Sequence, residues 1–273
     1  MKILISVDIE GVAGVTHTEQ TRSGNPEYER ARAWMTAEAD AAIRGAFDGG
    51  ATEVLVNDSH GGFRNLLLDR MDERVQMVTG KPRYLGMMAG AEQGCDAVFL
   101  IGYHSGAGTP GVLAHTINSF AFRRVAINGV ELNEAGLYGA LAGELGVPVA
   151  LMTGDDVFLA ETQPRFPNAL TVQTKQAQGH ASCISLSPAH ACSLIHQAAV
   201  EAISQVPSLH PYRLPGPGFH CELATQTTGQ ADLFCQLPML ERVNATALSF
   251  EANSMEALVR MLNSLSAMSF MLR

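Results

Sequence analysis

Short, nearly continuous apolar runs recur along the first part of the chain. Runs of this kind are typical of parallel strands that are buried on both faces of a sheet. The pattern predicts four such strands, within residues 2–7, 52–60, 95–104 and 148–156. A weaker run at 75–80 predicts one more strand in the same region.

Helical patterns lie between these runs. Segment 24–51 is the longest, with Asn25 as a cap, Pro26 in the first turn and Gly49-Gly50 at its end. Because strands alternate with helices, the sequence indicates an α/β fold, with a mostly parallel sheet flanked by helices.

The rest of the first 206 residues contains a turn signal and further helical patterns. Asn128-Gly129 is typical of a β-hairpin turn, and a helix rich in small residues follows it. Ser187 and Pro188 suit the cap and the first turn of another helix. A short helix is also predicted at 84–94.

Residues 207–218 interrupt the pattern, because they are rich in proline and have no periodicity. Beyond them the sequence predicts strands at 219–225 and 245–252, a helix around Leu233 and a final helix at 254–272. A chain of 273 residues is long enough for a large domain and a small one. We therefore expect an α/β domain over 1–206 and a smaller C-terminal α+β subdomain over 207–273.

Composition narrows the class of protein. Hydrophobic residues make up 47% and charged residues 16%, which predicts a substantial core. The net charge of −9 and the absence of a basic stripe argue against a nucleic-acid partner. No apolar run is long enough for a membrane span, and no signal peptide precedes the first strand, so we expect a cytoplasmic protein without a membrane partner. The five cysteines form no Cys-x-x-Cys pair and are expected to be reduced.

Metal-type ligands follow three of the predicted strands. Asp8 and Glu10 come after the first strand, His60 after the second and His104 after the third strong one. A lone histidine is more often a structural residue, but carboxyl ends of parallel strands meet at one edge of a sheet, where ligands bind. Imidazole mixed with carboxylate suits zinc, manganese or cobalt better than calcium or magnesium. Two ions that share a carboxylate would use such a set and offset its like charges.

Two further residues are candidates for the same centre. Glu134 could supply a third carboxylate, although a glutamate at a helix start is commonly explained by the helix dipole alone, and composition favours that explanation. His115 lies in a loop marked by glycine and proline, from which it could reach the centre and transfer protons near neutral pH. A surface histidine is the equal alternative.

Other polar residues near strand ends have two interpretations each. Asp58 and Ser59 serve the turn or orient His60 through its second nitrogen. Asp155 and Asp156 line the same pocket or cap a helix. Lys175 is either a solvated base or an anchor for a substrate carboxylate.

The motifs SVDIEG, VNDSH, GYH, His115-Thr116 and NEAGL occur in the order and spacing of a known family. The chain resembles the DppA-like D-aminopeptidases, from the first strand to at least residue 188. The resemblance implies a zinc enzyme that hydrolyses the N-terminal D-amino acid from short peptides through a water activated by two metal ions. It further implies two Zn²⁺ per chain, with Mn²⁺ or Co²⁺ possible, and a homo-oligomer that forms a ring decamer. The implied metal ligands are Asp8, which bridges, and Glu10, His60, His104 and Glu134, with His115 as the catalytic residue.

The sequence departs from the family pattern next to one of these ligands. Asn133 stands where the family usually has glycine, and one extra residue separates His115 from the glutamate. Glu131 therefore competes with Glu134 for that role, although the E-x-G-L context favours Glu134. The alternative functions are a dinuclear-metal phosphoesterase, another amidohydrolase, or an inactive protein that a metal stabilises.

Overall fold

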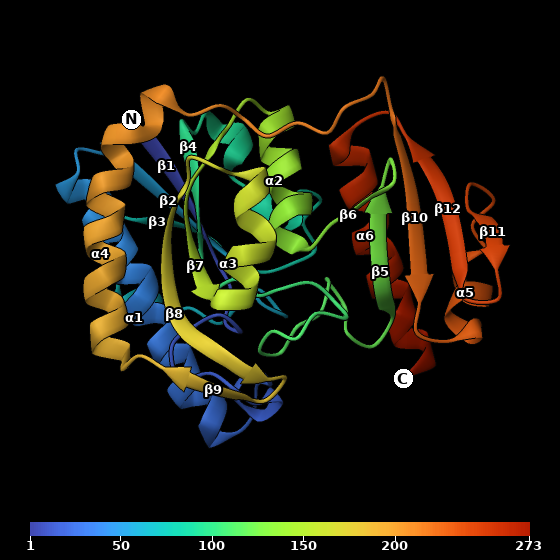
Figure 1. Ribbon diagram of the computed structural model, residues 1–273, viewed down its shortest axis with the longest axis horizontal. Helices are drawn as coiled ribbons and strands as arrows, with labels where there is room; N and C mark the ends of the chain where they lie inside the picture. The colour runs from blue at the N-terminus through green and yellow to red at the C-terminus, as the bar shows by residue number, and fades with distance from the viewer.

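Two β-sheets organise the computed structural model, which describes residues 1–273 (Figure 1). The larger sheet has seven strands, in the spatial order β3 (Gln76–Val78), β2 (Glu53–Asp58), β1 (Lys2–Val7), β4 (Ala97–Ile101), β7 (Val149–Asp155), β8 (Leu170–Gly179) and β9 (Ser182–Ser185). Its neighbouring strands are parallel except for the β8–β9 pair. The predicted α/β fold with a mostly parallel sheet is confirmed.

Both faces of the larger sheet are buried, as the apolar runs predict. Ile3, Ile5 and Val7 belong to the core beneath helices α1 (Pro26–Asp48) and α4 (Pro188–Gln205), which pack side by side on one face. The predicted helix start is also confirmed, because the Asn25 side chain accepts the Tyr28 N–H.

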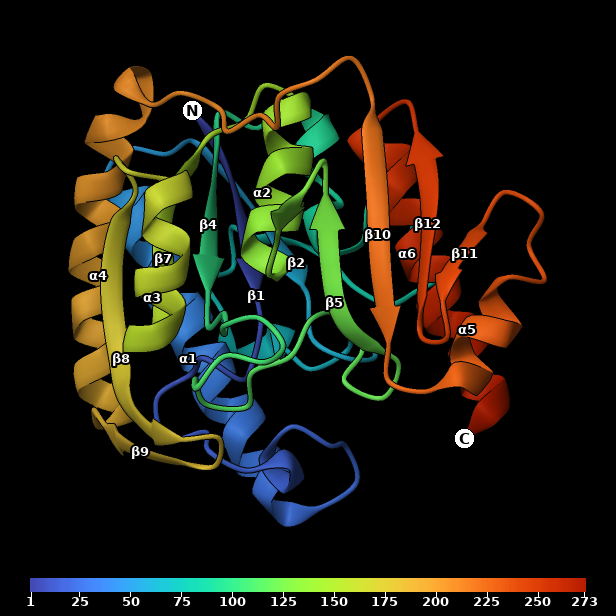
Figure 2. The same cartoon turned by 45° about the vertical axis from the view of Figure 1, so that its right-hand side comes forward.

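The opposite face of the sheet contacts a second, separate core. Leu4 of β1 joins this core, together with side chains of α2 (Glu134–Glu144), α3 (Asp156–Thr162) and α6 (Met255–Met268). Beyond these helices lies the smaller sheet, with the order β11 (Glu241–Asn244), β12 (Ala247–Ala252), β10 (Phe219–Thr225), β5 (Phe122–Ile127) and β6 (Val130–Glu131). Helix α5 (Thr228–Phe234) follows β10, and Figure 2 shows this sheet with α5 and α6 at one end of the molecule.

The smaller sheet takes strands from both sides of residue 207. β5 and β6 precede the predicted boundary, and β5 pairs with β10, which follows it. Between them, the proline-rich segment 209–218 has no regular structure and crosses from α4 to β10 (Figures 1 and 2). The boundary at 206 therefore does not separate the two sheets, and the division into two domains stays a prediction.

Short 3₁₀ turns connect several elements, namely η1 (Thr18–Gln20), η2 (Leu68–Arg70), η3 (Gly86–Met88), η4 (Ala91–Gln93), η5 (Gln163–Arg165), η6 (Val206–Ser208) and η7 (Ser269–Leu272). Two of them, η3 and η4, replace the helix predicted at 84–94. Gly86, Gly90 and Gly94 all have positive φ values, at 53°, 108° and 77°, which an α-helix does not allow. The hairpin turn at Asn128-Gly129 is confirmed, with φ values of 51° and 78°.

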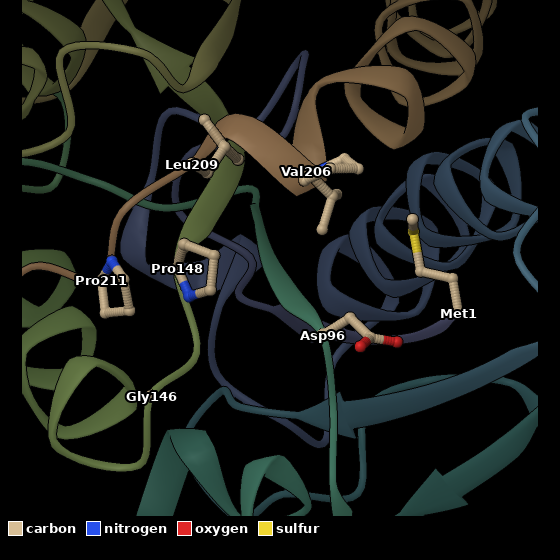
Figure 3. Close-up of a pocket in the computed structure, with 8 residues that line it drawn as sticks. Met1, Asp96, Gly146, Pro148, Val206, Leu209 and Pro211 are labelled. Atoms are coloured by element: carbon tan, nitrogen blue, oxygen red, sulfur yellow. The ribbon is translucent and has the colours of Figure 1, made fainter.

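A cavity of about 510 Å³ lies at the amino ends of the central strands (Figure 3). Met1, Asp96 and Pro148, which precede β1, β4 and β7, line it together with Leu209 and Pro211. The predicted ligands follow β1, β2 and β4, so this cavity lies at the opposite end of the sheet. None of the helices is both long and apolar enough to pass through a bilayer.

Candidate metal centre

The predicted ligands meet at the point in the larger sheet where the order of the strands reverses. From β1 the chain builds β2 and β3 on one side and then crosses to β4 on the other side of β1. Loops that leave neighbouring strands diverge at such a point, and ligands of open α/β sheets bind there. Asp8 and Glu10 therefore lie between His60, which follows β2, and His104, which follows β4.

Asp8, Glu10 and His60 form one side of the centre. His60 Nδ1 lies 3.2 Å from Asp8 Oδ1 and 3.1 Å from Glu10 Oε2. Both acidic side chains are almost fully buried, with exposed fractions of 3% and 5%. The two acidic residues converge on one imidazole, as expected for residues two apart at a strand end.

His104, Glu134 and His115 form the other side. His104 Nε2 lies 3.4 Å from Asp8 Oδ2 and 3.4 Å from Glu134 Oε1. His115 Nε2 lies 3.7 Å from the same Glu134 oxygen, and its ring stacks on His104 with centroids 4.1 Å apart. Asp8 thus presents one oxygen to His60 and the other to His104, between the two sides.

Each of the three imidazoles is oriented by a backbone carbonyl. His60 Nε2 donates to Thr21 O at 2.8 Å, His104 Nδ1 to Ser105 O at 3.0 Å and His115 Nδ1 to Leu113 O at 2.9 Å. A carbonyl can only accept, so in neutral histidine the opposite nitrogen carries the lone pair. In every case that nitrogen faces the carboxylates, which is the arrangement of a metal-binding histidine.

The electrostatics of the cluster favour positive charge. Burial raises the pKa of Asp8, and the neighbouring Glu10 carboxylate raises it further. Burial would also raise the pKa of Glu10, but His60 lowers it well below its usual value. Burial acts against protonated His60 and His104, yet Glu10 and Glu134 hold their pKa values well above the ordinary one. Without the imidazoles, the carboxylates would be left as like charges in a buried site.

The residues present fit a pair of divalent cations. Glu10 Oε2 and His104 Nε2 are buried and make no hydrogen bond, although both atoms are aimed into the cluster. Ligand atoms of Asp8, Glu10 and His104 lie within 4.8 Å of one another, and so do those of His104, His115 and Glu134. Three carboxylates and at least two imidazoles suit zinc in number and type.

The loop that carries His115 is held in an unusual backbone conformation. Leu113 and Ile117 have φ values of 53° and 60°, which residues other than glycine rarely adopt. Hydrogen bonds fix the loop from several sides, since Val112 N–H donates to Asp155 Oδ2 at 2.7 Å and Ile117 N–H to Glu134 Oε1 at 2.6 Å. Such strain persists only where surrounding contacts determine it, commonly at functional sites.

Several secondary candidates have structural roles. Asp58 accepts the backbone N–H groups of Asn65 and Leu66, so it serves the turn and does not touch the His60 ring. Ser59 hydrogen-bonds to Ser6 Oγ at 2.7 Å. Glu131 is exposed and pairs with Arg124, away from the centre, so only Glu134 reaches the cluster.

Asp155 has the predicted capping role, whereas Asp156 and Lys175 bind backbone groups of other elements. Asp155 caps α3 by accepting the Phe158 N–H, and Asp156 accepts the Ala177 N–H. The interpretation of Lys175 as a solvated or substrate-binding base is wrong. It lies inside β8 with an exposed fraction of 1%, and backbone carbonyls occupy its donors.

Sequence reasoning missed the contact that joins the His115 loop to the end of the chain. Asn118 Nδ2 donates to Ser266 Oγ and to Ser269 Oγ, each at 3.0 Å. The partners are 148 and 151 residues apart in sequence, so no local pattern could reveal them. The C-terminal helix therefore helps to fix the loop of the candidate centre.

Comparisons with known proteins agree with this geometry. The profile of the D-aminopeptidase family, peptidase M55, matches residues 1–264. A D-aminopeptidase of Bacillus subtilis (strain 168) is 34% identical over 257 residues, which cover 93% of each chain. A solved structure described as the Zn-dependent D-aminopeptidase DppA from Bacillus subtilis, a self-compartmentalizing protease, superposes with a TM-score of 0.95. It is 30% identical, and the match covers 99% of this chain and 98% of the other.

These matches confirm the predicted fold class and the predicted enzyme class, and they favour an aminopeptidase over the alternative phosphoesterase. Because the profile and the relative both cover almost the whole chain, the similarity extends well beyond the centre. The chain therefore belongs to the D-aminopeptidase family, peptidase M55.

Proposed function

We propose that the protein is a zinc-dependent aminopeptidase that removes the N-terminal D-amino acid from short peptides. Two Zn²⁺ ions would be held by Asp8, Glu10, His60, His104 and Glu134. The observation that carries this proposal is the placement of Asp8, whose Oδ1 faces His60 and whose Oδ2 faces His104. A carboxylate in that position suits a bridge between two ions.

Each ion would have its own ligands besides Asp8. Glu10 and His60 would hold one ion, because their ligand atoms lie 3.1 Å apart on the same side of Asp8. His104 and Glu134 would hold the other, because theirs lie 3.4 Å apart on the opposite side. The lone pairs of both imidazoles already point inward, so no tautomer change is needed.

When bound, two zinc ions would lower the pKa of a water molecule and polarise the scissile carbonyl of the peptide. The remaining work falls to the protein. His115 is the most accessible imidazole of the centre, with 21% of its side chain exposed against 14% for His60 and 1% for His104. Its Nδ1–H is engaged by Leu113, so Nε2 is the atom that would carry a proton to the departing amine.

We also propose that the protein forms a closed ring of subunits, which the family resemblance implies to be a decamer. Supporting this, the solved structure that the chain matches is of a self-compartmentalizing protease. The mass of the particle by light scattering would test it, and a monomer would contradict it. A cytoplasmic location stays a prediction, supported by five cysteines that are all free.

The decisive experiment compares D-Ala-D-Ala with L-Ala-L-Ala as substrates of protein with a counted metal load, before and after chelation. We expect cleavage of the D-peptide alone, with two zinc ions per chain and loss of activity on chelation. Two bound ions without cleavage of either peptide would overturn the substrate class and direct attention to phosphoesters. Activity that survives complete metal removal would overturn the metal centre itself.

A further inference from the structure

Lys175 is buried in a place where lysine is rarely found. The chain has only three lysines, and this one has an exposed fraction of 1% in the middle of β8. Buried ammonium groups persist only where hydrogen bonds replace their hydration. The partners of Lys175 therefore indicate what the side chain does.

All three partners are backbone carbonyls of one loop. The loop follows β1 and comprises residues 8–15, and we call it the β1 loop. Lys175 Nζ donates to the carbonyls of Glu10, Val12 (3.0 Å) and Val15 (2.6 Å). An ammonium has three N–H groups, so its capacity is used in full. A substrate carboxylate would have no donor left there.

Neighbouring side chains complete the fixation of the β1 loop. Thr174 Oγ1, next to Lys175, donates to the Gly11 carbonyl at 2.6 Å. On the other side, Gly11 N–H donates to Gly102 O at 2.8 Å, and a Cβ at Gly11 would lie only 1.9 Å from the Tyr103 carbonyl. The loop thus packs tightly against the end of β4, and β8 holds it there.

The β1 loop carries Glu10, whose carboxylate has a buried oxygen without a hydrogen-bond partner. The position of that oxygen depends on the backbone of Glu10. If the Cα atom of Glu10 shifts, rotation of the side chain alone cannot return the oxygen to its place. The carbonyl of the same residue is one of the three that Lys175 binds. Lys175 therefore acts on Glu10 through the backbone carbonyl, and it makes no ion pair with the Glu10 carboxylate.

We propose that Lys175 is a positioning residue, which sets the affinity of the metal ion held by Glu10 and His60. This inference rests on the proposed two-metal function. Without the ammonium, three buried carbonyls would lose their donors, and the β1 loop would move or admit water to satisfy them. Outer partners that orient a metal ligand typically contribute about 10- to 100-fold in metal affinity.

The test is a double-variant cycle read by Co²⁺ binding to metal-free protein. Wild type, K175M, E10Q and the K175M/E10Q double variant are titrated with Co²⁺, and visible absorption and bound metal are measured. We expect K175M to lower the affinity for one of two ions by about 10- to 100-fold and to leave the other unchanged. We expect the double variant to bind no more weakly than E10Q alone, because Lys175 acts through Glu10.

K2M is the matched control, since it makes the same change at the far end of β1, where Lys2 pairs with Glu53. Wild-type affinity of K175M for both ions would overturn the inference, and so would losses that multiply in the double variant. Should K175M give no cooperative melt, K175Q, whose amide keeps two donors, takes its place under the same criteria. A wild-type protein that binds no Co²⁺ would instead refute the proposed function, so the two failures are distinguishable.

Discussion

His115 is the residue of the centre whose role separates most clearly from metal binding. Its lone pair lies at the edge of the cluster, and more of its side chain is exposed than that of His60 or His104. We expect H115A to lose turnover by roughly 10²- to 10⁴-fold, the usual contribution of a general acid or base, while the zinc content stays the same. Activity and metal content of one preparation would be measured together.

The exposed His190 in α4 offers a control for that variant, and H190A should behave as wild type. Retention of full turnover by H115A would remove His115 from the mechanism. Loss of zinc along with activity would instead make it a ligand, as its distance of 3.7 Å from Glu134 permits.

Glu38 makes stability depend on pH. Its Oε1 accepts the Ala13 N–H at 2.8 Å, but its Oε2 is buried without a partner, and burial raises its pKa from 4.5 to about 7. The folded state thus prefers the protonated carboxyl. Its contribution is fully present below pH 4.5 and is lost as pH rises through about 7.

We therefore expect E38Q, which keeps the acceptor for Ala13 but cannot ionise, to gain stability over wild type as pH rises. The gain between pH 5 and pH 8 should be at most on the order of 3 kcal/mol. Urea denaturation of both zinc-loaded proteins would measure it, because effects of pH on zinc binding cancel in the difference. A difference that does not change with pH would show that Glu38 is ionised throughout.

At the scale of single residues, the candidate ligands could be proposed from sequence and their supports could not. The cluster of Asp8, Glu10, His60 and His104 was predictable because each residue follows a strongly apolar strand, a signal that lies in the local sequence. Lys175 gave no such signal, because its partners are carbonyls of a loop about 160 positions earlier in the chain. A backbone carbonyl has the same chemistry in every residue, so sequence cannot mark it as a partner.

Among elements, the His115 loop and α6 are joined by Asn118. Asn118 is 7% exposed, and its amide donates to the hydroxyl groups of Ser266 and Ser269. We expect N118A to lower kcat by roughly tenfold to a hundredfold without loss of zinc, because small displacements of a catalytic group are costly. Steady-state kinetics and metal analysis would test this.

S264A is a suitable comparison for N118A, since Ser264 lies on the same helix but its exposed hydroxyl only bonds to the Arg260 carbonyl. An N118A enzyme with the kcat of S264A would mean that the contact to α6 has no influence on His115.

The elements with strong local signals were predicted well. β1, β2, β4 and β7 contain the predicted apolar runs and are buried almost throughout, and the caps of α1 and α4 form the predicted hydrogen bonds. The helix predicted at 84–94 does not form, because its three glycines adopt left-handed conformations that the apolar pattern cannot reveal.

For the whole molecule, the pairing of β5 with β10 was the main feature that the sequence could not predict. Strands that pair across such a distance are selected by the packing of both sheets, and local periodicity gives no information about the partner. Residues 207–273 therefore look like an appended unit in the sequence, whereas in the structure β10 is the central strand of the smaller sheet.

We accordingly expect a fragment of residues 1–206 not to fold as a stable unit. It would lose β10, β12 and α6, which share one core with buried side chains of β5 such as Phe122, Val125 and Ile127. Thermal melting followed by circular dichroism would compare it with the full chain. A cooperative melt of the fragment, with bound zinc, would contradict this and support an autonomous domain ending at residue 206.

The route by which Glu134 reaches the centre has a consequence for synthesis of the chain. All six residues of the centre lie in the first half of the sequence, yet Glu134 follows directly on the β5–β6 hairpin, whose partner β10 begins only at Phe219. A nascent chain on the ribosome would thus carry every chemical group of the centre well before the second sheet can close around that hairpin. Hydrolytic activity should appear only after most of the chain has emerged, so an interrupted translation product would not be a working peptidase.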